Sequence, residues 1–195
     1  MKQEILFALT IWQPWAHFLV TGAKRVENRD WPPPKALVGQ WIAIHAGKRY
    51  DKSGAYQIRA ELDLDVPAAD ALPASAIVAV AVLDRVVTED NDGLVWDDPW
   101  FVGAFGWYLR DVTPIEPVPC PGARKLWVVR GPARAQVRAR FLEARARMAA
   151  TFPVPGVVRP ATPSGPSSFA SGPTASPHDT EPMVGSQATR SDSSP

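Results

Sequence analysis

The chain has 195 residues, which is enough for one domain with a modest hydrophobic core. Its 21 Lys and Arg residues nearly balance 20 Asp and Glu residues, for a net charge of +1, so strong binding of nucleic acid through overall charge is excluded and any basic surface must be local. The single cysteine, Cys120, excludes an internal disulfide and a metal site built from several thiolates.

Six segments with the composition of β-strands predict a sheet-rich fold. They are rich in β-branched and aromatic residues, and Pro, Gly, Asn or Asp residues separate them. In chain order they are residues 5–11, 24–31, 40–47, 75–87, 105–112 and 125–129. So many short strands leave exposed edges unless the sheet curls toward closure. We therefore expect an α+β fold over residues 3–150, a small, partly closed β-barrel with two or three helices.

Two helices are predicted between these strands. In residues 13–22, Trp15, Phe18 and Leu19 can share one face, and Gly22 can end the helix in a left-handed conformation. Residues 51–62 form the second helical segment.

A third predicted helix, residues 132–152, closes the domain. Apolar residues recur at helical spacing along it, at Val137, Phe141, Ala144 and Met148. Its other faces carry arginines, namely Arg134, Arg138, Arg140, Arg145 and Arg147. This pattern fits either a solvated face or contact with phosphate groups.

The composition changes at the end of this helix. Residues 153–195 consist mainly of Pro, Ser, Gly, Thr and Ala, which cannot bury enough apolar area to offset the entropy of ordering, so we expect a disordered tail. The amino-terminal residues lack the pattern of a signal peptide, and no run of about 18 apolar residues occurs. We therefore expect a cytoplasmic protein without membrane contact.

The stretch TGAKRVENRDW, residues 21–31, concentrates charge at one place. If a strand begins near Arg25, Glu27 and Arg29 project to the same side because side chains alternate along a strand. Lys24, just after the helix-ending glycine, can reach the same pair. The three charges form either an exposed ion-pair cluster of little energetic weight or a buried network at a ligand site.

Neighbouring residues favour the ligand site. Trp12, Gln13 and Trp15 offer planar rings and an amide, which stack on bases and hydrogen-bond to them, although each tryptophan is equally suited to core packing. At the end of the next predicted strand, His45 adds a titratable ring and Lys48 another cation.

These residues also carry a family resemblance. The QPW of residues 13–15, followed by G-x-K-x-x-E-x-R in residues 22–29, resembles the opening of the ASCH family, which is related to the PUA-like RNA-binding barrels. The segments IAIHAGK, GAFGWYLRDVTPIEPVP and GARKLWVV are similar to later strands of the family, so that the resemblance spans roughly residues 5–130. It implies a β-barrel whose cleft, lined by Lys24, Glu27 and Arg29, binds RNA or a nucleotide.

The first functional hypothesis is therefore a binding module. Lys24 and Arg29 would contact a phosphate or an acceptor edge, and Glu27 would orient Arg29 or accept a base amino group. Single-stranded RNA suits such a cleft better than duplex RNA, whose base edges lie in a narrow groove. A pure interaction protein, based on the tail and the arginine-rich helix, is a further alternative.

The second hypothesis is a small hydrolase that acts on a modified nucleoside or on RNA. Some ASCH relatives are amidohydrolases that deacylate a modified cytidine with a lysine-activated threonine and a glutamate, and others are proposed ribonucleases. By this resemblance the lysine falls on Lys24, whereas the threonine falls on Glu27, so an acyl-enzyme mechanism is not expected. Glu27 could act as general base on water while Lys24 stabilises an oxyanion.

No metal and no cofactor are expected. Histidines are scattered, and the acidic segment that starts at Asp90 lacks the glutamate that closes an EF-hand loop, so it is predicted to be a solvated turn.

Overall fold

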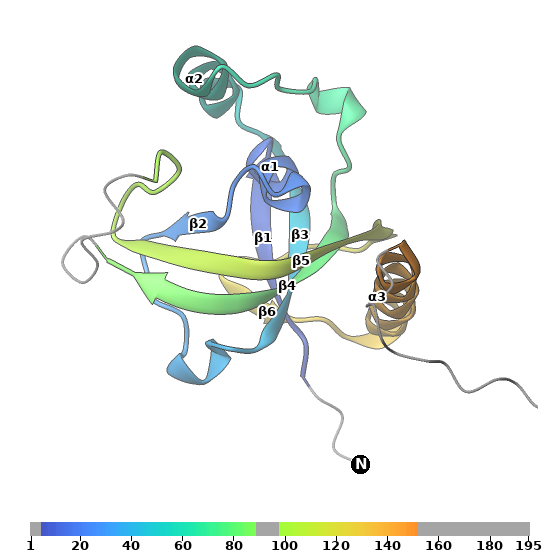
Figure 1. The fold of residues 1–195 in the computed structure, drawn as a ribbon. Helices are drawn as coiled ribbons and strands as arrows, with labels where there is room; N and C mark the ends of the chain where they lie inside the picture. The colour runs from blue at the N-terminus through green and yellow to red at the C-terminus, as the bar shows by residue number, and fades with distance from the viewer. Residues whose placement is uncertain (1–4, 89–97, 152–195) are drawn as a thin grey trace, which may run out of the picture. The chain divides into compact units, whose positions relative to one another are not determined.

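The computed structural model describes residues 5–88 and 98–151, which form a curled sheet accompanied by three α-helices (Figure 1). The strands are β1 Phe7–Gln13, β2 Val26–Arg29, β3 Trp41–Tyr50, β4 Ala76–Val87, β5 Phe105–Pro119 and β6 Leu126–Val128. Their order across the sheet is β2-β5-β4-β3-β1-β6. No described residues pair β2 with β6, so the sheet curls without closing. The predicted α+β fold with a partly closed barrel is confirmed.

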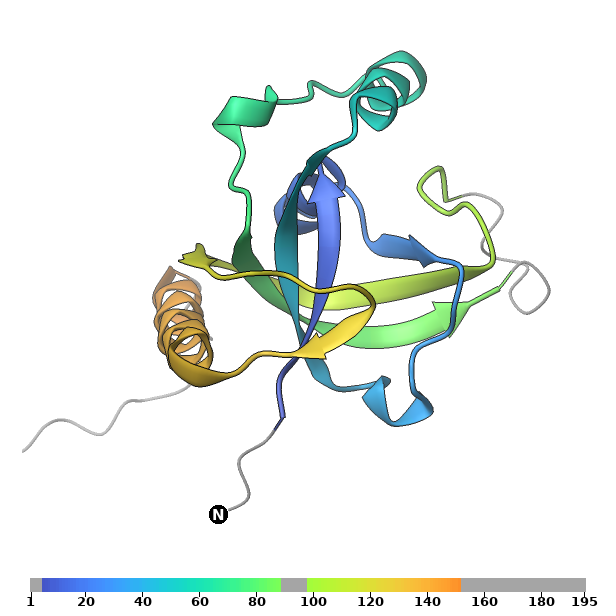
Figure 2. The same cartoon turned by 180° about the vertical axis from the view of Figure 1, so that it is seen from behind.

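The helices are α1 Trp15–Thr21, α2 Lys52–Leu62 and α3 Gly131–Thr151, with short 3-10 turns η1 Lys35–Leu37 and η2 Ala69–Ala71. All three α-helices were predicted. Of the strand pairs, β1 with β3 is parallel and the others are antiparallel. The segment between β5 and β6 passes over β1 and β3 on the side seen in Figure 2.

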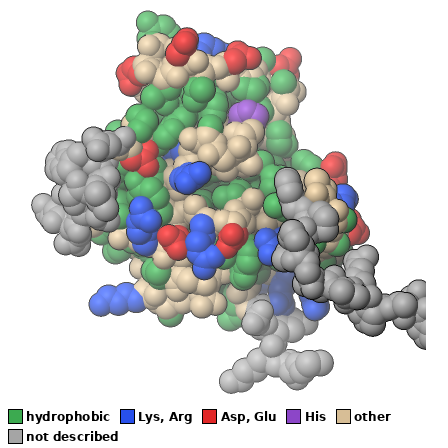
Figure 3. All heavy atoms as spheres, in the orientation of Figure 1, with side chains coloured by type: hydrophobic (Ala, Val, Ile, Leu, Met, Phe, Trp, Pro, Cys, Tyr) green, Lys and Arg blue, Asp and Glu red, His purple; other side chains and the backbone are tan. Residues whose placement is uncertain are grey.

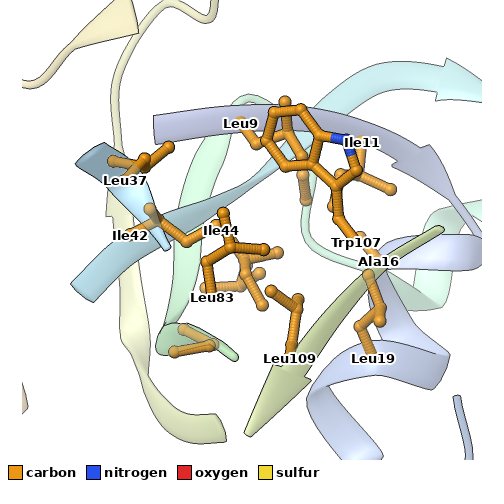
Figure 4. Packing of buried hydrophobic residues seen from close by; sticks show 14 residues of the cluster. Leu9, Ile11, Ala16, Leu19, Leu37, Ile42, Ile44, Leu83, Trp107 and Leu109 are labelled. Atoms are coloured by element: carbon orange, nitrogen blue, oxygen red, sulfur yellow. The ribbon is translucent and has the colours of Figure 1, made fainter. Parts of the chain in front are cut away.

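The sheet buries apolar side chains on both faces. Leu9 and Ile11 of β1 pack with Ala16 and Leu19 of α1 around the fully buried Trp107 (Figure 4). An aromatic side chain buried in this way contributes about 1.5–3 kcal/mol relative to an exposed one. Because side chains alternate along a strand, the next positions of β1 face the other way, toward a second cluster that α3 covers.

On that second face, α3 confirms most of its predicted apolar stripe. Val137 and Ala144 are buried, and Phe141 packs edge-on against Trp41 with ring centroids 5.0 Å apart. Met148, the last apolar residue at this spacing, is 45% exposed. It follows Ala144, the last core contact of α3, by one helical turn.

β5 is longer than predicted, because it continues past residue 112 through three prolines to Pro119. β2 pairs only with the first residues of β5, from Phe105 to Tyr108. Beyond them one side of β5 carries no strand, and prolines are tolerated at such an edge because no partner strand needs their missing N–H. α3 contacts this part of β5, where Arg140 donates to the carbonyls of Glu116 and Pro117.

Local contacts fix α1 and α2 beside each other. The Gln13 side-chain oxygen accepts a bond from the His17 amide at 3.0 Å, and Gly22, at φ +81°, ends α1 as predicted. Asp51 caps α2 by accepting from the Gly54 amide at 3.0 Å, and its other oxygen accepts from the Trp15 indole at 3.1 Å.

Two predictions fall on residues outside the described ranges, namely the disordered tail of residues 153–195 and most of the acidic turn that starts at Asp90. Among the helices that the structure does describe, none combines the length and apolarity needed to cross a bilayer.

Two candidate ligand cavities

The charged residues of the predicted motif form a chain of contacts. Lys24 follows α1, is 2% exposed, and donates to Glu27 Oε2 at 3.2 Å and to the Val26 carbonyl. Glu27 Oε1 lies 3.4 Å from Arg29 Nη2, which in turn donates to the Thr10 carbonyl of β1 at 2.8 Å. Glu27 and Arg29 lie on the same side of β2, as their alternation predicted, and the network is buried rather than solvated.

Burial sets the electrostatics of Lys24. Desolvation lowers the pKa of its ammonium group, and the negative charge of Glu27 opposes that shift. The Lys24 Nζ also lies 5.8 Å from the centre of the Trp15 ring, at the edge of cation–π range. Lys24 thus already has a carbonyl, a carboxylate and an aromatic ring as partners.

Lys24 and Glu27 line a cavity of about 390 Å³, hereafter the Lys24 cavity. Trp15 and Trp100 belong to its wall and meet edge to face, with ring centroids 6.3 Å apart. α2 contributes Glu61, so among the described residues the wall carries two carboxylates and one ammonium group. Acidic side chains also gather on the surface over α2 and the segment after it, at the top of Figure 3.

The predicted residues Gln13 and Trp12 lie outside the wall of this cavity. Gln13 is 3% exposed, and besides capping α1 it donates to the Pro73 carbonyl at 2.9 Å, so its amide holds the fold together. Trp12 is 42% exposed, and the Arg49 guanidinium lies 3.9 Å from its ring centre.

His45 and Lys48 line a second cavity of about 880 Å³, hereafter the His45 cavity, which shares no lining residue with the first. His45 lies in the middle of β3 and pairs in register with Thr10 of β1. The prediction that this strand ends near His45 is wrong, because β3 continues to Tyr50. The structure thus divides five of the predicted ligand-binding residues between two cavities, with Trp15, Lys24 and Glu27 in one and His45 and Lys48 in the other. The other three predicted residues, Trp12, Gln13 and Arg29, line neither cavity.

Several lining residues were missed by the sequence analysis. In the Lys24 cavity these include Asn28, Glu61 and Trp100, and the Asn28 amide donates to the Trp100 carbonyl at 2.8 Å. In the His45 cavity they include Gly122 and Arg124, from the segment between β5 and β6. Apart from Asn28, which belongs to the motif, these residues lie far in sequence from Lys24 and His45, and only the folded chain brings them to the two cavities.

Within residues 5–88 and 98–151, no three His, Cys, Asp or Glu residues lie close enough together to hold a metal ion.

Comparisons with known proteins show what this chain is similar to. Among solved structures, the chain is similar to the ASCH protein of Zymomonas mobilis, in its unmodified form and in two single-residue mutants, at 18% identity and TM-scores of 0.44 and 0.45. The match covers 68% of this chain and 93%, 94% and 96% of those three. A search of curated proteins gives no match. The family model for the ASCH domain matches residues 9–97, which include the whole motif, and this match confirms the predicted resemblance to the ASCH family.

Proposed function

We propose that the Lys24 cavity binds an uncharged nucleobase, presented by a nucleoside or by an unstacked base of single-stranded RNA. The observation that carries this proposal is the buried Lys24–Glu27 pair in the wall of a cavity with two tryptophans. A volume of about 390 Å³ lies within the usual range for small-ligand sites, about 300–1,000 Å³.

The charges of this cavity disfavour a phosphate group as its main occupant. The Lys24 ammonium is already bonded to the Val26 carbonyl and to Glu27, and the wall carries a second carboxylate, Glu61. A nucleobase has no charge, and its amino groups can donate to carboxylates while its face packs against indole rings. Trp15 and Trp100 provide such rings.

The experiment measures nucleoside binding to the full chain by calorimetry, with Lys24→Met and Glu27→Gln as site variants. We expect each variant to weaken binding about tenfold, since each removes one charge-assisted hydrogen bonding group from the wall. Lys35→Ala, which removes an exposed cation from η1, is the matched control and should bind like the wild type. Equal affinity in all four proteins, with unchanged melting temperatures, would refute the proposal.

The pairing of a carboxylate, Glu27, with a cation, Lys24, in the cavity wall favours a second function at the same place, hydrolysis of an N-acyl group on a nucleobase. Glu27 would take a proton from water as the water oxygen attacks the acyl carbon, and Lys24 would stabilise the oxyanion. The carbon–nitrogen bond then breaks, and the proton passes to the leaving amino group. Because Glu27 would act on water, no covalent enzyme intermediate forms.

Mass spectrometry of N-acylated nucleosides incubated with the chain separates the two functions. Loss of the acyl mass with the wild type but not with Glu27→Gln indicates a hydrolase. Unchanged nucleosides together with saturable binding indicate a binding module.

A further inference from the structure

The His45 cavity differs from the Lys24 cavity in its charge. Its wall carries two exposed cations, Lys48 of β3 and Arg124 of the segment after β5, and no acidic residue among the described residues that line it. Hydroxyl groups of Thr10 and Ser75 are also present. Cations and hydroxyls without a competing carboxylate are the groups that bind phosphate esters.

A buried acceptor without a partner lies in the same wall. His45 is 1% exposed, and its Nε2 is 3.0 Å from the Cys120 carbonyl. A carbonyl only accepts, so Nε2 carries the proton, and burial keeps the imidazole neutral by lowering its pKa. Nδ1 is then a bare lone pair, and it has no hydrogen-bond partner within the described residues. A ligand that satisfies it must bring a donor, such as a sugar hydroxyl.

Gly122 packs directly against this acceptor. A Cβ at this position would lie 2.7 Å from His45 Nδ1 and 2.8 Å from Thr10 Oγ1, closer than side chains approach one another. Any other residue would therefore clash with the imidazole and the Thr10 hydroxyl. Trp127 holds that hydroxyl in place by donating to it at 3.0 Å.

An exposed ring flanks the cavity. Gly47 belongs to its wall, and a Cβ on Gly47 would lie 3.5 Å from Trp12 Cδ1, so the Trp12 indole borders the cavity. Thr10 and Trp12 are two residues apart on β1 and therefore face the same way.

From these observations we propose that the His45 cavity is a second site, which binds the ribose phosphate of a ribonucleotide. Lys48 and Arg124 contact the phosphate, a ribose hydroxyl donates to His45 Nδ1, and the base lies against Trp12. This inference stands without the proposed function, because the two cavities share no lining residue.

The test titrates the full chain with ribose 5-phosphate, with inorganic phosphate and with adenosine 5′-monophosphate, and follows backbone amides by NMR. We expect saturable shifts at Gly47 and Gly122, with tighter binding of ribose 5-phosphate than of phosphate and the tightest binding of the nucleotide. Lys48→Ala/Arg124→Ala should weaken ribose 5-phosphate binding about a hundredfold, roughly tenfold for each cation. Trp12→Ala should weaken only the binding of the nucleotide, so that the nucleotide binds no more tightly than ribose 5-phosphate.

Three further variants locate the site. Gly122→Ala should weaken ribose 5-phosphate more than inorganic phosphate, because its methyl group clashes with the His45 imidazole that the ribose hydroxyl contacts. Lys24→Met and the surface control Lys35→Ala should leave ribose 5-phosphate binding unchanged, although Lys24→Met lowers nucleoside binding if the first proposal holds. The inference is overturned if Lys48→Ala/Arg124→Ala binds ribose 5-phosphate like the wild type, or if no shifts saturate at Gly47 and Gly122. A short RNA that shifts these amides while the mononucleotide does not would likewise reject a site for single nucleotides.

Discussion

At the scale of single residues, the buried Lys24–Glu27 pair calls for a reason beyond stability. Removing two charges from water costs several kcal/mol, and their attraction often only offsets this, so apolar residues would stabilise the fold at least as well. The chain instead places this pair in the wall of a cavity. Desolvation there lowers the pKa of Lys24, and the charge of Glu27 opposes this shift. Perturbed ionisable groups in cavities are typical of functional sites.

His45 leads to a prediction about pH. Burial lowers its folded-state pKa below the ordinary value of 6.5, so as the pH falls the unfolded chain binds this proton before the folded chain does. The free energy of unfolding should therefore be highest near neutral pH and fall as the pH drops from about 7 to 5. Urea denaturation across this range should show the decline, and His45→Asn should reduce its slope.

His17 provides the comparison, because burial lowers its pKa as well. His17→Asn should remove a separate part of the slope, and the double variant should be the flattest of the four proteins. A His45→Asn variant with the full wild-type slope would show that the folded protein protonates His45 as readily as the unfolded chain does.

At the scale of secondary-structure elements, the contact of α2 with α1 depends on one glycine. A Cβ on Gly54 would lie 2.3 Å from Trp15 Cζ2, and the indole cannot swing away freely because its N–H is bonded to Asp51. Gly to Ala in a helix interior ordinarily stabilises by about 1 kcal/mol. Here we expect the opposite, a loss of about 1–3 kcal/mol from overpacking, measured by denaturant unfolding.

Ser53→Ala, one residue earlier on an exposed position of α2, controls for helix propensity and should change stability little. Because α2 lines the Lys24 cavity, Gly54→Ala should also weaken nucleoside binding. A stabilised Gly54→Ala variant would mean that α2 moves away from Trp15 at no cost.

Sequence patterns predicted the elements better than their contacts. Composition, turn residues and helical patterns located all six strands and three helices, and alternation placed Glu27 beside Arg29, because these signals are local. The extension of β5 through its prolines depends on the shortness of β2, which alternation does not reveal. The separation of His45 from Lys24 depends on tertiary packing, because His45 lies within β3 whereas Lys24 lies between α1 and β2. Most other residues that line the two cavities come from segments distant in sequence, and only tertiary packing determines which segments meet.

At the scale of the whole molecule, balanced charge limits how nucleic acid can bind. The net charge is +1, and on the face in Figure 3 basic and acidic side chains alternate. The broadest alternative to a compact phosphate site is the set of exposed arginines of α3, which includes Arg138, Arg145 and Arg147. The two differ in how many phosphates they neutralise, and salt dependence reports that number.

We predict a shallow salt dependence for a short single-stranded RNA. If the His45 cavity holds one phosphate, the slope of log K against log salt concentration should be about −0.7, whereas three further contacts along α3 would steepen it to about −3. Filter binding at several salt concentrations measures the slope, and Lys48→Ala/Arg124→Ala should bring it close to zero while Arg138→Gln/Arg147→Gln leaves it unchanged. A steep slope that only the α3 variant reduces would contradict the prediction. It would mean that the RNA binds on α3 and not in the His45 cavity, because the phosphate contacts that set the slope would then lie on arginines outside both cavities.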